Sequence, residues 1–260
     1  MKTGRDSEKK SRKLPLVLVL LAVFAVFVIF VMVKNSRKPE RLDLGALDAG
    51  VKGAAFIKTN QLLVKQLFGN WMPNDLFWPT VLLDNMPNFQ IGELEVIRYN
   101  IRVLRDDLSR MRTTDKLDPW AEAAFTALSN DPYKWWFPSA ESKWKLAEKN
   151  LKEFYSNLST GASHFYPRAD NLVQLLNQYL SLMGGINTRL INAPGDRKRV
   201  LTLDQDSIGG AKPGTVDIGI PWSEIDDNFY YAQGAAYALY ESFQALRTDF
   251  MEVLVDKNSV

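Results

Sequence analysis

The residues that could carry acid–base chemistry are few, and they do not form a recognisable catalytic set. His164 is the single histidine, and the adjacent carboxylates are Asp106/Asp107 and Asp226/Asp227. Consecutive residues on a helix point about 100° apart, so neither pair is by itself an acid–base couple. The sequence contains no nucleophile elbow of the form G-x-S-x-G. We interpret His164 as structural and the pairs as solvated charges or helix-dipole partners, with general-base use of His164 as the alternative.

Metal ligands are equally scarce. The stretch DQDSIGGAKPGT, residues 204–215, begins like a calcium loop, with two aspartates and then Gly209 at the sixth position. The last position is Thr215, so the bidentate glutamate that completes such a loop is missing. The chain has no cysteine and one histidine, which excludes cysteine–zinc sites and multi-histidine sites supplied by one chain. We predict neither a metal site nor a cofactor.

Aromatic residues gather in the stretch DPYKWWFPSAESKW, residues 131–144. Trp144 begins a run of apolar residues spaced three and four apart, which predicts that it packs in a helical core. Four further aromatic residues precede Pro138 and lie outside this run; this aromatic cluster comprises Tyr133, Trp135, Trp136 and Phe137. The cluster has two interpretations: a plug over the end of a bundle, or a partly exposed platform for a glycan, a lipid or a protein partner.

The charges are separated along the chain. Seven of the 32 basic residues but only two of the 30 acidic residues lie in the first 34 positions. The rest of the chain therefore carries 25 basic and 28 acidic residues. This balance lacks the basic footprint of a nucleic-acid-binding domain, and we expect no nucleic-acid partner.

The elements that must position these residues are helices, because apolar residues recur at helical spacing in four segments. In chain order the stripes are Leu94, Ile97, Ile101, Leu104, Leu108 and Met111; Trp144, Ala147, Leu151, Phe154 and Leu158; Val173, Leu176, Leu180 and Met183; and Ile225, Phe229, Ala232, Ala236, Leu239, Phe243, Leu246, Phe250 and Val253. A weaker helix is predicted at about residues 44–68. The middle of the last helix is thin, which permits close approach of a neighbouring helix; its small residues are Ala232, Gly234, Ala235, Ala236 and Ala238. Such stripes usually pack within one antiparallel bundle, although a two-chain coiled coil uses the same spacing.

Boundary residues agree with these helices. Aspartate before proline and serine are N-cap signals, and glycine ends helices. The predicted starts are Asp118, Asp131, Ser139 and Asp170, and the predicted ends are Gly161 and the pair Gly184–Gly185. Residues 187–220 differ, since RVLTL (199–203) and TVDIGI (215–220) flank the turn-rich SIGGAKPG. The predicted fold class is therefore mainly α: one N-terminal transmembrane helix followed by a helical-bundle domain with a short irregular or β-hairpin excursion.

Residues 14–33, LPLVLVLLAVFAVFVIFVMV, carry no charge and are long enough to cross a bilayer as a helix. A signal-peptide core is shorter, and the following VKNSRKPE offers no small-x-small cleavage pattern, so we predict a retained anchor. The basic residues before the span favour a cytoplasmic N-terminus. The expected organisation is a cytoplasmic basic tail (1–13), a transmembrane anchor (14–33), a juxtamembrane linker (34–43) and a periplasmic helical domain (44–258) at the bacterial inner membrane.

Three phrases carry a family resemblance: LLDNMPNFQIGEL (82–94), FYPRADNL (165–172) and IDDNFYYAQGAAYAL (225–239). In this order they resemble a bacterial family of membrane-anchored proteins that is classed as a domain of unknown function. The resemblance implies one helical envelope domain behind one N-terminal span, and it brings no reaction, cofactor or catalytic residue. One departure is Gln233, at a position where the family pattern leads us to expect arginine.

The same phrases suggest polar positions with a role. These are Asp84 and Asn85 in DNMP, Arg168 and Asp170 in RADN, and Asp226 and Asp227 in IDDN. Their ordinary role is helix capping and loop fixation. A further hypothesis is a salt bridge from Arg168 to Asp226 or Asp227 that ties the third helix to the fourth.

Three functions agree with the sequence to different degrees. The favoured one is a non-catalytic, membrane-anchored envelope protein that acts through protein–protein contact in the periplasm, with an envelope protein or a second copy as partner. The second is a binder of peptidoglycan, polysaccharide or lipid through the aromatic cluster. The least favoured is a hydrolase that uses carboxylates and His164, which would need a deep polar pocket.

Overall fold

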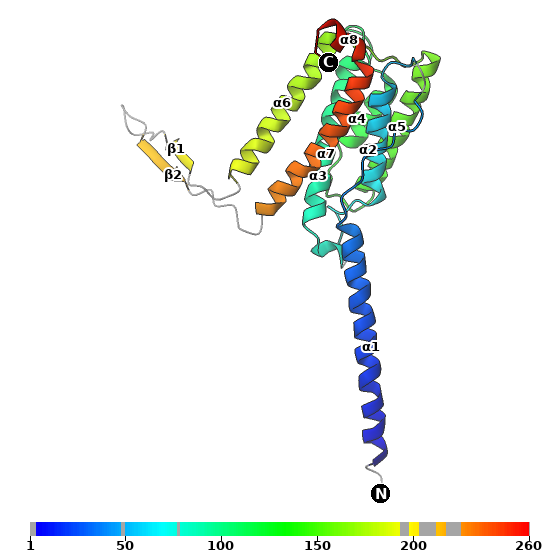
Figure 1. Ribbon diagram of the computed structural model, residues 1–260, viewed down its shortest axis with the longest axis vertical. Helices are drawn as coiled ribbons and strands as arrows, with labels where there is room; N and C mark the ends of the chain where they lie inside the picture. Colours follow the sequence, from blue (N-terminus) through cyan, green and yellow to red (C-terminus); the bar gives the residue numbers. More distant parts are fainter. Residues whose placement is uncertain are drawn as a thin grey trace.

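The chain forms a helical bundle with one long helix that projects from it, as the computed structural model shows (Figure 1). The structure describes residues 4–47, 50–76, 79–192, 198–202, 212–216 and 225–259. Its elements are α1 (Gly4–Asn35), α2 (Ala54–Gly69), η1 (Thr80–Leu82), α3 (Asn85–Val103), the π-helical turn η2 (Leu104–Leu108), α4 (Pro119–Leu128), α5 (Ala140–Thr160), α6 (Ala169–Asn192), β1 (Lys198–Thr202), β2 (Lys212–Val216), α7 (Ile225–Asp249) and α8 (Met251–Asp256). The predicted fold class is confirmed.

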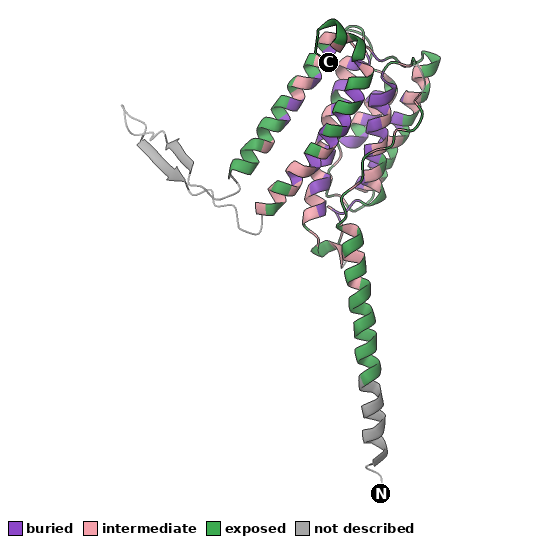
Figure 2. Cartoon of the chain, in the orientation of Figure 1, coloured by how far each residue is buried: buried purple, intermediate pink, exposed green. Residues whose placement is uncertain are grey.

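The core lies among α2, α3, α4, α5 and α7, with α6 packed along one side (Figure 2). Helix α2 packs against α5 and α7, and α3 packs along α7. Trp144 is fully buried, as predicted, and its ring meets the ring of Trp71 edge to face at a centroid distance of 5.4 Å. Other large side chains with no exposed surface include Phe56, Leu63, Ile97, Ile101, Leu151, Phe154 and Tyr179.

Two glycines bring α3 and α7 into backbone contact. A Cβ atom at Gly234 would lie 1.8 Å from the carbonyl oxygen of Phe89, and one at Gly92 would lie 2.0 Å from that of Tyr231. These distances are far below any real carbon–oxygen contact, so both positions require glycine. The close approach predicted from the small residues of the last predicted helix is confirmed.

Several predicted helix ends are confirmed in detail. The Asp118 carboxylate accepts hydrogen bonds from the N–H groups of Trp120 and Ala121 at the start of α4. The Ser139 hydroxyl accepts a hydrogen bond from the N–H group of Ser142 at the start of α5. Gly161 ends α5 in the left-handed conformation, with a φ angle of 73°. Local capping chemistry therefore sets these boundaries.

Three predicted boundaries are wrong. Helix α2 starts at Ala54 rather than near residue 44, because Gly45, Gly50 and Gly53 have positive φ angles that a continuing helix excludes. No helix starts at Asp131, whose carboxylate accepts a hydrogen bond from the N–H group of Tyr133 in a single turn. Helix α6 does not end at Gly184–Gly185 but runs to Asn192; glycine weakens a helix by only about 1 kcal/mol and does not by itself stop one.

The apolar stripe predicted for α6 is displaced by about one residue from the face that is buried. The stripe predicted for α7 is confirmed in part: Leu239, Leu246 and Phe250 are buried, whereas Phe229 and Phe243 are exposed. In α6 the buried residues are Leu175, Tyr179 and Leu182, whereas Val173 and Leu180 are 53% and 63% exposed. In α7 the buried face comprises Tyr231, Gly234, Ala235, Ala238, Leu239, Glu241, Ser242, Ala245 and Leu246. Apolar residues cover more than one face of each helix, and the close α3–α7 packing selects the face with the small side chains.

Strands β1 and β2 pair antiparallel, with Lys198 opposite Val216 and Thr202 opposite Lys212. The excursion between the third and fourth helices thus includes a β-hairpin pairing, one of the two forms expected. Most of the calcium-like stretch and the end of the second predicted strand lie outside the described residues.

The segment after α1 is fixed along α7. The Lys38 ammonium donates a hydrogen bond to the side-chain oxygen of Gln233, and the Tyr237 hydroxyl donates one of 2.8 Å to the Glu40 carbonyl. The Arg41 guanidinium lies 5.0 Å from the centroid of the Tyr240 ring. Gln233, which stands where the family pattern leads us to expect arginine, therefore accepts a hydrogen bond from a lysine. An arginine has no acceptor and could not do so.

Candidate functional surfaces

The predicted site residues fall at two opposite ends of the bundle. At the α1 end, α2 finishes, α3 begins, and η1 between them packs beside α1. At the far end, the start of α2 meets the end of α7, where Asp249 accepts hydrogen bonds from α2. The start of α4 meets the loop after α5 at the same end, where the Ser163 hydroxyl donates a hydrogen bond to Asp118. Figure 1 shows the same division. Any function that needs residues from both ends must therefore act across the full length of the bundle.

The aromatic cluster lies at the α1 end, in the loop between α4 and α5. The exposed fractions are 58% for Tyr133, 53% for Trp135, 68% for Trp136 and 84% for Phe137. The two tryptophan rings meet each other edge to face at 5.3 Å. A plug would be covered by the bundle end, so these exposures favour the interpretation of the cluster as a platform.

The loop that carries the cluster is held firmly beneath its exposed side. The Trp71 indole N–H donates to the Pro132 carbonyl at 2.9 Å, and the Asn74 amide donates to the Lys134 carbonyl at 3.2 Å. Both donors come from the segment that follows α2. The aromatic side chains are therefore displayed on a fixed support.

Two other predicted polar sites at the α1 end lie at helix starts. The Asp84 carboxylate accepts a hydrogen bond of 2.8 Å from the N–H group of Asn85 at the start of α3. Asp226 and Asp227 lie in the first turn of α7, where carboxylates compensate the helix dipole. The positions of Asp84, Asp226 and Asp227 agree with the ordinary capping role.

A polar hollow of about 420 Å³ opens at the far end. Arg168 on its wall binds Asp170 through two hydrogen bonds and donates a third, of 2.9 Å, to the Met111 carbonyl. The hypothesis that Arg168 forms a salt bridge with Asp226 or Asp227 is wrong. Both aspartates lie in the first turn of α7, at the α1 end of the bundle, whereas Arg168 lies at the far end. Arg168 instead fixes the start of α6 to the loop after η2. The lining comprises Asp106, Asp107, Arg110, Met111, Arg112, Thr113, Arg168, Asp170, Asn171 and Gln174.

The acidic pair Asp106/Asp107 is divided between two environments. Asp106 lies 2.7 Å from the Arg105 guanidinium, which also reaches Glu122 at 3.5 Å. Burial raises the pKa of Asp107, and the negative charges of Asp106 and Asp170 add to this rise while Arg110 opposes it. The π-helical turn η2 carries both residues, and such turns are frequent at functional sites.

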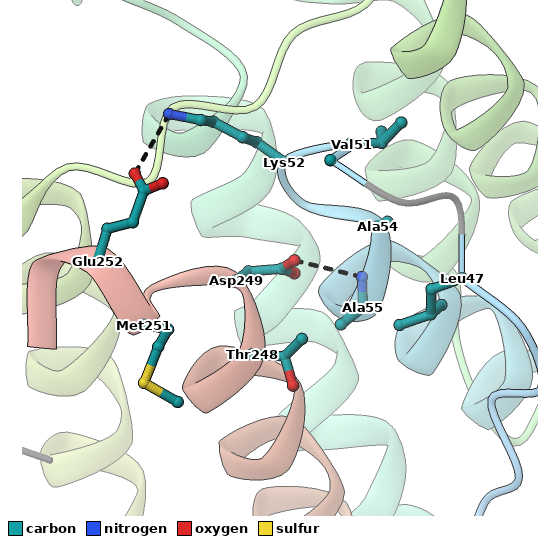
Figure 3. A pocket seen from close by; sticks show the side chains of 10 residues that line it. Leu47, Val51, Lys52, Ala54, Ala55, Thr248, Asp249, Met251 and Glu252 are labelled. Atoms are coloured by element: carbon teal, nitrogen blue, oxygen red, sulfur yellow. Dashed lines mark hydrogen bonds and ion pairs between the residues drawn. The ribbon is translucent and has the colours of Figure 1, made fainter. Parts of the chain in front are cut away.

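A second hollow of about 390 Å³ at the far end lies beside Asp249 (Figure 3). The Asp249 carboxylate accepts hydrogen bonds from the N–H groups of Ala55 and Phe56, at 3.4 Å and 2.7 Å, and so caps α2 from a distant helix. Burial nevertheless raises the pKa of Asp249 to about 6. Lys52 and Glu252 form an exposed ion pair across the same opening, at 3.6 Å. Asp249 is thus a structural carboxylate whose charge changes near neutral pH.

Sequence reasoning missed a buried polar network in the core. The Asn100 amide donates to Asn60 and to Ser242, each at 2.8 Å, and the Tyr179 hydroxyl donates to the Asn100 oxygen at 2.6 Å. The network joins α2, α3, α6 and α7, and all four side chains are fully buried. Asn100 falls between Ile97 and Ile101 on the core face of α3, a position that could have marked it as a buried polar residue. Because every member is bonded, the network specifies how these helices pair.

The remaining candidates for chemistry are not brought together. His164 is exposed, with its ring 5.9 Å from that of Tyr166, and it lines neither hollow. In the part of the chain that the structure describes, no group of three His, Asp or Glu side chains is placed to hold a metal ion.

A third surface is the outward face of α6, which sequence reasoning placed in the core. Val173, Leu180 and Met183 are exposed on it, by 53%, 63% and 40%, and Leu190 by 37%. No charged residue occurs between Asp170 and Arg189. An exposed helix face without charges is unusual for a protein surface in contact with water alone.

The comparisons with known proteins give one match. A bacterial family described as "Uncharacterized protein conserved in bacteria (DUF2333)" matches residues 9–260. No curated protein and no solved structure matches the chain.

Proposed function

The chain belongs to the bacterial family DUF2333, and we propose that it is a non-catalytic protein of the bacterial inner membrane that acts through protein–protein contact in the periplasm. Within the described residues, one helix, over Pro15–Asn35, is apolar enough to cross a membrane. The residues that follow the apolar run, VKNSRKPE, offer no small-x-small cleavage pattern, which supports retention of α1 rather than its removal as a signal sequence. Basic residues before the span support a cytoplasmic N-terminus.

The observation that carries the contact function is the outward face of α6. Its apolar residues follow a heptad pattern, with Val173, Leu180 and Asn187 in the first core position and Leu176, Met183 and Leu190 in the second. All of these residues except the half-buried Leu176 are exposed. A face of this kind on a helix that already packs one side against its own core is suited to pairing with another helix.

The partner that this face fits best is a second copy of the chain. Two copies anchored by α1 in one membrane have the same orientation, so their α6 helices run parallel. Asparagine in the first core position, as at Asn187, favours parallel two-stranded pairing because the two amides bond each other across the axis. Confinement to a membrane raises the effective concentration of the two faces, which helps a short seam to pair.

A single introduced cysteine tests this pairing, because the natural chain has none. Residues in the first core position face each other across a parallel pair at a distance that suits a disulfide. In membranes treated with a mild oxidant, Leu180→Cys is expected to give a covalent dimer of the full chain. Ser181→Cys, one residue away on the helix and also exposed, is the matched control and is expected to remain monomeric.

Equal crosslinking at both positions would indicate random collision, and absence of a Leu180→Cys dimer would exclude the parallel pair. Products that contain only other proteins would likewise exclude self-association. A dimer at Leu180 that disappears when Met183 is replaced by Glu would support the apolar seam, since two like charges would then be buried in it.

The second candidate function is binding of peptidoglycan, polysaccharide or lipid by the aromatic cluster. The exposure of Trp136 and Phe137, 68% and 84%, favours it. Retention of the full chain on purified sacculi, compared with the Trp135→Ala/Trp136→Ala variant, tests the glycan form. No difference between the two proteins would remove it.

A further inference from the structure

The α1 end of the bundle exposes apolar side chains from two separate stretches. Leu76, Val81 and Leu82 are exposed by 51%, 49% and 59%, around the short helix η1. The aromatic cluster is the other stretch, and the bonds from Trp71 and Asn74 hold its loop against the segment that leads to η1. The sequence from 76 to 83, LFWPTVLL, contains no charged residue.

The exposed residues around η1 lie close to α1, because η1 packs against the last turns of that helix. Along α1 from Pro15 to Asn35, the half-buried residues are Val28, Val31, Met32 and Asn35, and all others are exposed. Their spacing places them on one face, and η1 packs against α1. Val28 and Asn35 are seven residues apart, which is about 10 Å along a helix.

This contact sets the depth of η1. Val28, Val31 and Met32 belong to the apolar run that ends at Val33, and the charged Lys34 follows directly. If that run fills the hydrocarbon of a bilayer, an element packed against its last two turns lies at the outer boundary of the same bilayer.

We propose that the α1 end is a lipid-contacting surface, in which Leu76, Val81 and Leu82 enter the outer leaflet and the aromatic cluster lies at its headgroups. Tryptophan and tyrosine prefer this interfacial depth, because the ring is apolar and one atom can form a hydrogen bond. The surface holds the bundle close to the membrane and fixes its tilt. This inference rests on the proposed anchoring by α1, and it assigns the aromatic cluster to lipid rather than to glycan.

The test uses full-length protein in lipid nanodiscs whose lipids carry a quencher at a known depth. Single cysteines at Leu82 and Trp136 carry a fluorophore, with Met111→Cys as the matched control: Met111 is also apolar and 55% exposed but lies at the far end. Lipid quenchers just below the headgroups are expected to quench the Leu82→Cys probe several-fold more than the Met111→Cys probe. The Trp136→Cys probe is expected to be quenched by headgroup-level quenchers.

A fourth probe, Phe27→Cys, separates the two proposals. Phe27 lies within the apolar run and is 57% exposed in the isolated chain. Strong quenching of Phe27→Cys with equal, weak quenching of Leu82→Cys and Met111→Cys would overturn the lipid surface while leaving the anchor intact. Absence of quenching at Phe27→Cys would overturn the anchor itself. An unquenched Trp136→Cys probe beside a quenched Leu82→Cys probe would remove the aromatic cluster from the surface.

Discussion

The two ends of the bundle are built by the same helices and yet present opposite chemistry. The α1 end exposes Leu82, Trp136 and Phe137 next to the helix that is apolar enough to cross a membrane. The far end also exposes apolar residues, among them Met111, Leu117, Met251 and Val255, and Met111 lies beside arginines and aspartates that bond one another. What distinguishes the α1 end is its neighbour, because η1 packs against α1 there.

The largest effect is predicted for a substitution that forces α3 and α7 apart at their closest approach. Gly234→Leu is expected to destabilise the protein by about 3 kcal/mol or more, because even the first added carbon overlaps the Phe89 carbonyl. Denaturant unfolding of the full chain in detergent, followed by circular dichroism, measures this. Gly184→Ala is the control: no atom lies within 4 Å of the added carbon, and the change should stabilise α6 by about 0.5–1 kcal/mol. Equal effects would show that the crossing is not tight.

The second prediction concerns the pH dependence of stability at the far end. The pKa of Asp249 is raised to about 6 in the fold, whereas an unfolded aspartate has a pKa of about 3.9. Between these values the folded state holds more protons, so the free energy of unfolding falls as pH rises. From pH 5 to pH 7 the loss due to Asp249 is expected to be about 1 kcal/mol. Burial also raises the pKa of Glu93 and of Glu241, which act in the same direction.

Asp249→Asn isolates this contribution. The amide oxygen can still accept the N–H group of Phe56, although the NH2 group cannot replace the oxygen that accepts from Ala55, and the amide does not titrate. Unfolding at pH 5, 6 and 7 should therefore give a flatter curve for the variant than for the natural chain. Parallel curves would mean that Asp249 is not the group responsible.

A smaller effect is expected at the polar hollow. Arg168→Ala removes the bonds to Asp170 and to the Met111 carbonyl, and it should cost about 0.5–1 kcal/mol because the pair is half exposed to water. Arg168→Lys keeps the charge but loses the paired geometry, and should recover only part of the loss. Full recovery by lysine would show that charge alone fixes this loop.

The smallest stability effect is predicted for the α1 end surface itself. Trp135→Ala/Trp136→Ala should change the free energy of unfolding by less than about 0.5 kcal/mol, because both rings are mostly exposed and pack chiefly on each other. Thermal unfolding in detergent measures this. A large loss of stability would show that the aromatic cluster is a structural plug over the end of the bundle rather than an exposed platform.

The sequence by itself determined the helical class, the apolar run of α1 and the ends of helices that local capping controls, such as Asp118, Ser139 and Gly161. These features depend on residues within one or two turns of each other, so the local pattern contains the whole cause. The small residues around Gly234 also predicted a close crossing, because lack of side-chain volume is a property of the residue type.

Only the tertiary structure decided which faces of α6 and α7 are buried. A spacing of three and four residues describes both the buried Leu175, Tyr179 and Leu182 and the exposed stripe through Val173 and Leu180. When apolar residues cover more than one face, the buried face is the one that a neighbour can approach most closely, and α3 is that neighbour for α7. The grouping of η1 with the aromatic cluster likewise depends on contacts between segments more than 40 residues apart, such as Trp71 with Pro132, which no local pattern contains.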